Sequence, residues 1–586
     1  MVWNRFWGRD RWWMLTAPAL LFLTIVYILP IARTIGSSVT DPKPGFGNYA
    51  TLLGTHGYEI VVLRTIGIGL AVTAICFVLG YPLAYAISRS TGAARLGLLI
   101  AVVSPYLTST LVRTFAWEVL LSRLGPVNQV LSLLGWGSHD MLFTPVAVII
   151  GLVHVSLPLM VLPLVGVMNQ VDRLVMRSAT SLGAGNALTF IRVFIPLTKP
   201  GIELGSLLVF VYSIGAFITP AILGGQNGAM LGSLIQTAAV QYVELGFASA
   251  AATTLGIIVA ATLALYYFVG TSAGRPLGPS TRDRLAGKGR RRHPAGMSFE
   301  SLQYGLRTAT WRLADFIDRV GLGQSRLPVG VFATVISCFL LIPQLIVVPI
   351  SFSGTQTLIF PPHSLSLQWY ANFLTPDWLG PVWVSLSVGA VVAVAATVLG
   401  TLAAVGIVHA EWSTLRSVGS LLILLPLLMP PVIAAIALYA TFLPLGLTDS
   451  ILGLILAHTT LTLPFAFTVM AAAESLVDQR VERAAQSLGA GLLTVLRKVT
   501  LRLLMPSLLI ALVLSFLVSF DESVVGVFLS GIFVKTLPAA MFDAVTMQSD
   551  PTIGVVATVS VAVAAACLVF VSLIERRLGT TARRFL

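Results

Sequence analysis

Charged residues are scarce in this chain, and their scarcity excludes an ordinary soluble domain. Asp, Glu, Lys and Arg make up 10% of its 586 residues, against roughly 25% in soluble proteins. Hydrophobic residues make up 56%, and the mean hydropathy is +0.91. A chain of this composition is expected to have lipid as the solvent around most of its length.

Cysteine is almost absent as well. The three cysteines, Cys76, Cys338 and Cys567, lie inside apolar runs and lack the spacing of a disulfide framework or a metal site. We expect all three to be buried packing residues.

Motifs of hydrolytic chemistry are also missing. The sequence has no G-x-x-x-x-G-K-[S/T] phosphate loop, no nucleophile elbow and no H-E-x-x-H metal pair. We therefore expect a protein that is not an enzyme and that binds no cofactor or metal. Any ATP and Mg²⁺ would be bound by a separate partner subunit.

Long apolar runs are what the sequence has in abundance. Each is long enough for a membrane helix, which needs about 20 apolar residues, and none alternates like a barrel strand. The runs predict an all-α membrane protein of about 12 transmembrane helices, the first of which is retained and not cleaved as a signal peptide. The predicted spans are 14–38, 59–87, 96–121, 143–168, 200–220, 248–270, 328–351, 379–408, 418–443, 451–472, 506–526 and 553–574.

Lys and Arg outnumber Asp and Glu by 36 to 23. In a soluble protein this excess would favour nucleic acid, but between membrane spans it marks the cytoplasmic side. Most of the basic residues fall on one side of the predicted spans, which places both termini in the cytoplasm. We expect contact with membrane lipid and none with nucleic acid, the run Arg290-Arg291-Arg292 included.

A basic linker, 271–327, separates two halves of six spans each, 1–270 and 328–586. The first part of the linker is rich in Gly, Pro and charge, which is typical of disorder. From Phe299 to Val320, apolar residues recur at helical spacing and predict an amphipathic helix on the inner membrane surface.

A polar segment occurs twice. Residues 171–197, the first repeated segment, align with 477–503, the second repeated segment, at an offset of 306 positions (489 − 183). Both contain Asp at the second position and the run S-L-G-A-G, beginning at Ser181 and Ser487. Because both halves carry the segment at the same place, we interpret the halves as parallel repeats.

The glycine in each copy follows a predicted helix, where a left-handed C-cap turns the chain sharply. The pattern predicts helix–turn–helix outside the bilayer, with small residues that let a partner surface approach closely. The alternative is two ordinary interfacial helices, but the repetition favours docking. The candidate docking residues are Arg177, Ser178, Ala179, Gly183, Glu482, Arg483, Ala484, Ala485 and Gly489.

The repeated segments resemble the cytoplasmic coupling loops of ABC importer permeases, whose pattern is E-A-A, three residues, G, and a later I-x-L-P. Arg177 and Arg483 stand where that pattern has its leading acid, with Glu482 one position earlier, and Arg502 replaces the proline of the second copy. The resemblance implies a type I importer fold and two ATPase subunits, one at each segment. It leaves open whether Glu482 replaces the missing acid.

The similarity extends through both halves to spermidine/putrescine-type permease subunits, notably at 104–129, 214–225 and 425–438. It implies two fused permease halves in the bacterial inner membrane and a periplasmic or lipid-anchored substrate-binding protein. The implied substrate is a polyamine or a related small cationic or organic solute. Ferric iron, thiamine and aminophosphonate remain alternatives, since close relatives carry them.

Two adjacent acids, Asp521 and Glu522, lie inside a predicted span beside Phe520. Buried carboxylates with aromatic rings suit an organic ammonium ion, although a helix cap or a contact to the binding protein would also explain them. The candidate substrate-pathway residues are Asp521, Glu522, Phe520, Tyr212, Phe217 and Trp117.

Three other intramembrane ionisable residues, Arg64, Glu203 and His409, lie near predicted span ends, which favours side chains reaching for the interface. His154 and His458 do not align in the repeat, so we expect each to hydrogen-bond to a neighbour and not to share a metal.

A twelve-helix secondary transporter of the major facilitator kind is the alternative class. Such a transporter would carry a signature loop of the form G-x-x-x-D-R-x-G-R between the second and third spans. This chain has the stretch Ser88 to Arg95 there, which contains no acid.

Overall fold

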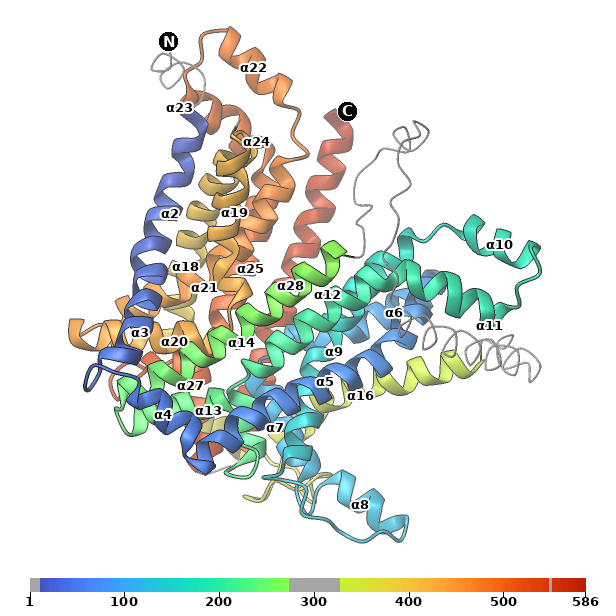
Figure 1. Ribbon diagram of the computed structural model, residues 1–586, viewed down its shortest axis with the longest axis vertical. Coiled ribbons are helices and arrows are strands. Elements are labelled where there is room, and N and C mark those ends of the chain that lie inside the picture. The colour runs from blue at the N-terminus through green and yellow to red at the C-terminus, as the bar shows by residue number, and fades with distance from the viewer. Residues whose placement is uncertain (1–10, 273–326, 411, 548–550, 586) are drawn as a thin grey trace, which may run out of the picture.

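The computed structural model describes residues 11–272, 327–410, 412–547 and 551–585, and these residues are helical apart from turns, loops and one β-bridge between Ser353 and Leu365 (Figure 1). The fold prediction is confirmed. The proposed amphipathic helix and nearly all of the linker lie outside the described residues.

The N-terminal half contains the following elements. Its first span joins η1 (Arg11–Thr16), α2 (Ala17–Leu23), η2 (Thr24–Ile28) and α3 (Leu29–Thr40), and later spans are α5 (His56–Arg89), α9 (Pro145–Gln170), α12 (Ile195–Ile214) and α14 (Leu245–Ser272). Shorter elements are α4 (Gly47–Gly54), α6 (Gly92–Val103), η3 (Ser104–Leu107), α7 (Thr110–Leu121), α8 (Pro126–Leu133), α10 (Arg173–Ser181), α11 (Asn186–Thr189), η4 (Phe190–Phe194), η5 (Pro220–Gly224), α13 (Leu231–Gln236) and η6 (Thr237–Gln241).

The C-terminal half repeats this order. Its long helices are α16 (Leu327–Ser351), α18 (Pro376–Val408), α21 (Ile451–Glu474) and α28 (Thr552–Phe585). The remaining elements are α17 (Gln368–Phe373), α19 (Ser413–Leu428), α20 (Pro431–Phe442), η8 (Leu443–Leu445), α22 (Gln479–Ser487), α23 (Leu492–Val495), η9 (Leu496–Thr500), α24 (Leu501–Leu503), α25 (Met505–Phe520), α26 (Val524–Leu529) and α27 (Leu537–Met547).

Nine helices of the described chain are long and apolar enough to cross a membrane, or up to eleven if two bent pairs each count as one span. The pairs bend by 93° between α19 and α20 and by 77° between 492–503 and α25. The first bend falls at Pro430-Pro431, where proline removes a backbone donor and crowds the preceding turn. The predicted span 96–121 is likewise broken, into α6, η3 and α7.

Two predicted spans end earlier in the structure than in the sequence analysis. The predicted 200–220 ends as α12 at Ile214, and the predicted 506–526 ends as α25 at Phe520. The sequence analysis placed Asp521 inside a helix. In the structure it is instead the C-cap residue of α25. Both ends lie at the contact between the halves.

The first span of each half packs against the other half. Elements η1 and α2 contact α18 and α19, whereas α16 contacts α5, α6 and α7. At the first contact, Gly406 of α18 lies so close to η1 that a Cβ there would collide with Thr16. Such reciprocal contacts are what a two-fold relation between two similar units produces.

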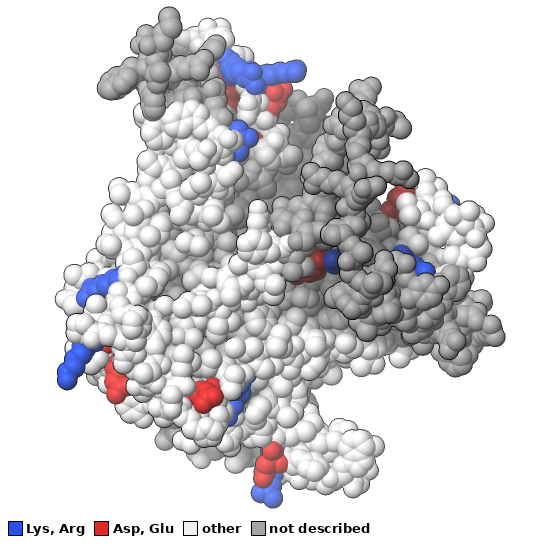
Figure 2. Space-filling view, in the orientation of Figure 1, with Lys and Arg blue, Asp and Glu red and all other residues white. Residues whose placement is uncertain are grey.

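The surface matches a chain surrounded by lipid. Figure 2 shows a broad white surface, with most of the Lys, Arg, Asp and Glu gathered toward its edges. Cys76 is buried as expected, but Cys338 is exposed and Cys567 is half-buried, so the packing prediction is wrong for Cys338. Cys338 lies on the face of α16 that also exposes Val331, Val335 and Ile342, and membrane helices need no polar outer face.

Candidate functional site

The two repeated segments have the same local structure at the same offset. Helix α10 (Arg173–Ser181) corresponds residue for residue to α22 (Gln479–Ser487). Each helix is capped at its start by the repeated aspartate. Asp172 accepts a hydrogen bond from the Leu174 N–H at 2.8 Å, and Asp478 accepts one from the Arg480 N–H at 2.9 Å.

The repeated glycines end these helices in the left-handed conformation, as predicted. Gly183 has φ of +88° and Gly489 has φ of +87°. In each copy the residue after the glycine donates a hydrogen bond back into the last turn, Ala184 to Ala179 at 3.2 Å and Ala490 to Ala485 at 3.1 Å. This is the Schellman pattern, which favours glycine because a Cβ strains the left-handed region.

The turn presents an exposed leucine in both copies. Leu182 is 89% exposed and Leu488 is 90% exposed. Arg177, Ser178, Arg483 and Ala484 are also exposed. The sequence analysis missed both leucines, although they belong to the repeated S-L-G-A-G run. The segments lie apart from each other, α22 at the top of Figure 1 and α10 at the right.

The helix after each turn differs from the expected separate interfacial helix. In the first segment, α11 continues through the π-helical η4 into α12, so that 186–214 forms one membrane span. In the second, the chain passes through η9, also π-helical, and bends at Leu504 before α25. Each turn is therefore followed by chain that leads into a membrane helix.

Glu482 faces inward and not toward the exposed surface of α22. It is 2% exposed and accepts hydrogen bonds from Thr500 and from His409, the latter at 2.7 Å. Burial opposes its ionisation, but these hydrogen bonds outweigh burial and lower the pKa of Glu482 below its ordinary value. Its carboxylate is therefore already engaged inside the protein, away from the exposed Arg483.

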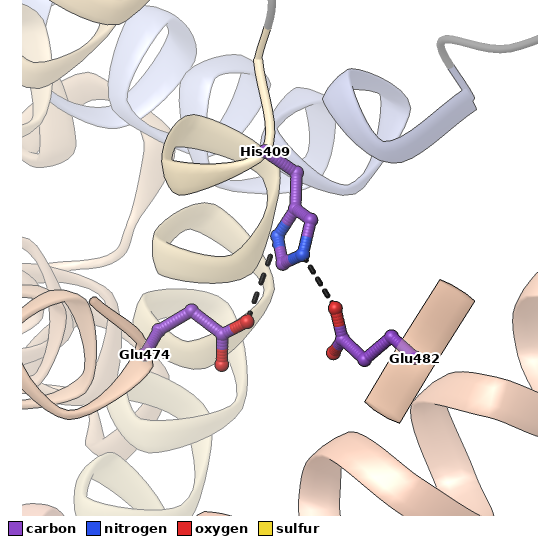
Figure 3. A group of neighbouring side chains, drawn as sticks. All are labelled: His409, Glu474 and Glu482. Carbon is purple, nitrogen blue, oxygen red and sulfur yellow. Dashed lines mark hydrogen bonds and ion pairs between the residues drawn. The ribbon is translucent and has the colours of Figure 1, made fainter. Parts of the chain in front are cut away.

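His409 was expected to reach for the membrane interface, and this interpretation is wrong. It follows the end of α18 and lies between Glu474 and Glu482 (Figure 3). Burial alone would lower the pKa of His409. The hydrogen bond to Glu482 and the negative charge of Glu482 outweigh burial and raise this pKa above its ordinary value. No signal in the sequence pairs these residues, because His409 and Glu482 are 73 positions apart.

A second polar group lies where the two halves meet; we call it the central polar cluster. Ser109 lies within interaction range of Asp521, and Tyr212 lies within interaction range of Thr110. Tyr212 lies within electrostatic range of Arg113, Asp521 and Glu522. The structure thus brings together three predicted pathway residues, Tyr212, Asp521 and Glu522, from opposite halves. The cluster comprises Ser109, Thr110, Arg113, Tyr212, Asp521 and Glu522.

The arginine of this cluster is almost fully buried, at 4% exposed. Its Nη2 donates to the Thr110 hydroxyl at 3.0 Å and its Nε to the Ser109 carbonyl at 3.3 Å. Glu522 accepts from the N–H groups of Val524 and Val525, so it also caps α26. With all groups ionised, one positive and two negative side chains leave the cluster with a net negative charge.

The aromatic candidates are packing residues in this conformation. Phe217 is buried against Phe528 and Phe542 of the other half, at ring-centroid distances of 5.9 and 5.4 Å. Trp117 packs on Phe339 at 5.4 Å. Phe520 is buried and stacks on Phe516 at 5.8 Å. Phe217 and Trp117 thus pack across the contact between the halves.

The two buried histidines are hydrogen-bonded separately. His154 contacts the Leu340 carbonyl at 3.1 Å, and His458 contacts the Ser519 carbonyl at 3.1 Å. The partners are on different elements, as expected for two unrelated side chains.

Comparison with known proteins gives several matches. The family described as binding-protein-dependent transport system inner membrane component matches residues 396–579. The spermidine/putrescine transport system permease protein PotB of Escherichia coli (strain K12) is 34% identical over 256 residues, covering 42% of this chain and 93% of that protein. The corresponding PotC protein of Haemophilus influenzae is 29% identical over 247 residues, covering 42% of this chain and 95% of that protein.

A match among solved structures is more distant. A bacterial ABC transporter involved in the import of the acidic polysaccharide alginate aligns with a TM-score of 0.39 and 18% identity, covering 47% of this chain and 99% of that chain. Each of these relatives is thus matched over most of its own length by less than half of this chain.

Proposed function

Because this chain belongs to the family of binding-protein-dependent transport system inner membrane components, we propose that it combines both permease halves of an ATP-driven importer and carries polyamines or a related organic cation. As an inner-membrane permease of such a system, it is a non-catalytic transport component. The family assignment leaves no place for the major facilitator alternative.

Fusion of two halves is supported by three observations. The repeated segments have matching caps and turns at one offset. The first span of each half packs against the other half. Single-subunit relatives match over nearly their whole length while covering about 42% of this chain. In this proposal, residues 1–270 and 328–586 are the two halves, joined by 271–327, with both termini in the cytoplasm.

Two copies of an ABC ATPase subunit would dock on the two repeated segments. The exposed Leu182 and Leu488 would enter hydrophobic pockets on these subunits, while Gly183 and Gly489 allow the tight approach. When ATP draws the ATPase subunits together, the turns would pull the helices that follow them and open the pathway outward. A periplasmic or lipid-anchored substrate-binding protein would deliver the solute to that opening.

The substrate proposal depends on one observation, the meeting of Asp521, Glu522 and Tyr212 where the halves contact each other. Two carboxylates against one guanidinium favour a cation, and the neighbouring Phe520 adds an aromatic face. Relatives named as spermidine/putrescine permeases agree with this choice. Arg113 would suit an anionic solute such as an aminophosphonate, but it is one guanidinium against the two carboxylates of Asp521 and Glu522.

Reconstitution tests the proposal. The chain would be placed in liposomes with its neighbouring ATPase and binding protein, and uptake of labelled putrescine and spermidine would be measured with and without ATP. We expect uptake that needs all three components. Binding-protein-stimulated ATP hydrolysis without polyamine uptake would reject polyamines and direct the search to ferric iron, thiamine or aminophosphonate.

A further inference from the structure

His409 bridges the second repeated segment and the membrane helices. Its Nε2 lies 2.7 Å from a Glu482 carboxylate oxygen on α22, and its Nδ1 lies 3.5 Å from Glu474 at the end of α21 (Figure 3). Thr500 of η9 donates to the other oxygen of Glu482. We call His409, Glu474, Glu482 and Thr500 the His409 cluster. It joins α18, α21, α22 and η9 at one buried point.

The contacts of His409 favour a ring that carries a proton on both nitrogens. Nδ1 faces the Val405 carbonyl at 3.0 Å as well as Glu474, and Nε2 faces Glu482. Neutral imidazole has one N–H and one lone pair, so it would direct a lone pair at an acceptor on one side. Trp12 stacks on the ring at 4.6 Å between centroids with planes 18° apart, which further favours a cation.

One histidine and two glutamates in this arrangement could also hold a metal ion. The two carboxylates, however, approach different ring nitrogens (Figure 3). An ion held by all three side chains would bind one nitrogen of His409 and would therefore replace the His409–Glu482 hydrogen bond. Proton-mediated bridging fits the contacts as they stand.

The first repeated segment has no equivalent cluster. At the offset of 306 positions, Glu474, Glu482 and Thr500 correspond to Met168, Met176 and Phe194. Phe194 is fully buried, and the guanidinium of Arg89, at the end of α5, lies 5.2 Å from its ring centroid. Arginine stays charged at every physiological pH, so this contact contains no group that titrates near neutrality.

We propose that His409 is a positioning residue that, as an imidazolium, holds the second repeated segment against the membrane helices, so that coupling through this segment alone depends on pH. The coupling part rests on the proposed importer function. Charged or polar groups approach His409 from α21 (Glu474), α22 (Glu482) and η9 (Thr500), and Trp12 of η1 covers its face. Arg416 of α19 donates to the adjacent Ala410 carbonyl at 2.7 Å.

The direction of the pH effect follows from the two shifts. The pKa of His409 is raised above the ordinary histidine value of about 6.5. Its ion pair with Glu482 is therefore complete below about pH 6.5 and is lost as the pH rises through the raised pKa. The pKa of Glu482 is lowered, so this carboxylate stays ionised throughout that range. Alkaline pH should therefore release the second segment and leave the first in place.

Spin labels test the release without any transport measurement. Single cysteines would replace Ser487 and its repeat counterpart Ser181, both exposed, in a full-length background with Cys338 and Cys567 changed to Ala. Between about pH 6 and pH 9, we expect the label at position 487 to gain mobility and the label at 181 to stay unchanged. His409→Lys should abolish the change at 487. Equal changes at both positions, or none at 487, would overturn the proposal.

Coupled uptake provides the functional readout. In the reconstituted complex we expect uptake per ATP to fall by about five-fold or more from about pH 6.5 to 8.5, at the lower end of typical coupling effects. His409→Lys should flatten this profile, while His409→Gln should be low throughout. A His409→Lys profile that still falls like the parent's would reject pH-dependent coupling. Label mobility that follows the prediction in a complex with no uptake at all would instead reject only the importer function.

Discussion

Gly183 and Gly489, one in each half, have φ values of +88° and +87° and end their helices with the same pair of backbone hydrogen bonds. The two left-handed turns have the same conformation at one offset of 306 positions. Each turn lies directly before a helix that continues toward or into the membrane.

Gly489→Ala should weaken coupling while leaving the protein inserted. A Cβ at this position meets nothing within 4 Å, so the cost is backbone strain of about 1–2 kcal/mol. Gly489→Asp should be at least as damaging, because it adds charge at the docking turn. Gly491→Ala is the matched control, since Gly491 also has open space but has φ of −69°. ATP-driven uptake by Gly489→Asp equal to the parent's would count against docking at this turn.

Leu488→Ser should reduce ATPase binding without reducing stability. The side chain is 90% exposed, so removing it takes nothing from the packed interior, whereas it removes an apolar contact worth about 1.5–3 kcal/mol if the partner buries it. Leu182→Ser should act similarly, and the double variant should bind weakest. Co-purification of the ATPase subunit measures the effect. Leu374→Ser, on an exposed residue outside the repeated segments, should bind ATPase normally.

Asp521→Asn and Glu522→Gln should lower polyamine uptake by about ten-fold or more, the factor that corresponds to about 1.4 kcal/mol. Each removes one negative charge from the central polar cluster. ATP hydrolysis should persist, because it depends on docking of the ATPase subunits at the repeated segments and not on these acids. Glu203→Gln serves as a control because its carboxylate pairs with Lys199 at 3.3 Å, outside the cluster. Polyamine uptake unchanged in both cluster variants would remove these acids from the pathway.

Gly215→Val should destabilise the contact between the halves. A Cβ on Gly215 would collide with the Pro430 ring of the other half, and overpacking of this kind costs about 1–3 kcal/mol. Thermal unfolding in detergent should therefore begin at a lower temperature. Gly67→Ala provides the comparison, because a Cβ there meets nothing within 4 Å. An unchanged melting temperature for Gly215→Val would show that the halves do not pack as described.

The sequence was sufficient for features that depend on neighbours along the chain. Hydropathy located most of the spans, and the repeated Asp and Gly located the caps and turns of α10 and α22. Contacts between distant segments could not be predicted in the same way. His409 and Glu482 come from different helices 73 positions apart, and Ser109 meets Asp521 only because the halves face each other.

The span ends show the same limit. Apolar residues continue past Ile214 and Phe520, so hydropathy extended both helices beyond their ends. The chain turns there because Gly215 accommodates Pro430 and because Glu522 caps the next helix. These are tertiary and capping effects that a window of hydropathy does not contain.

The stoichiometry of the purified complex tests the central claim most directly. Native mass spectrometry of the chain with its ATPase would count the subunits. One chain bound to two ATPase subunits is the predicted result, because each chain carries both repeated segments. A complex of two chains with two ATPase subunits would contradict the account, since each chain would then supply only one working coupling site.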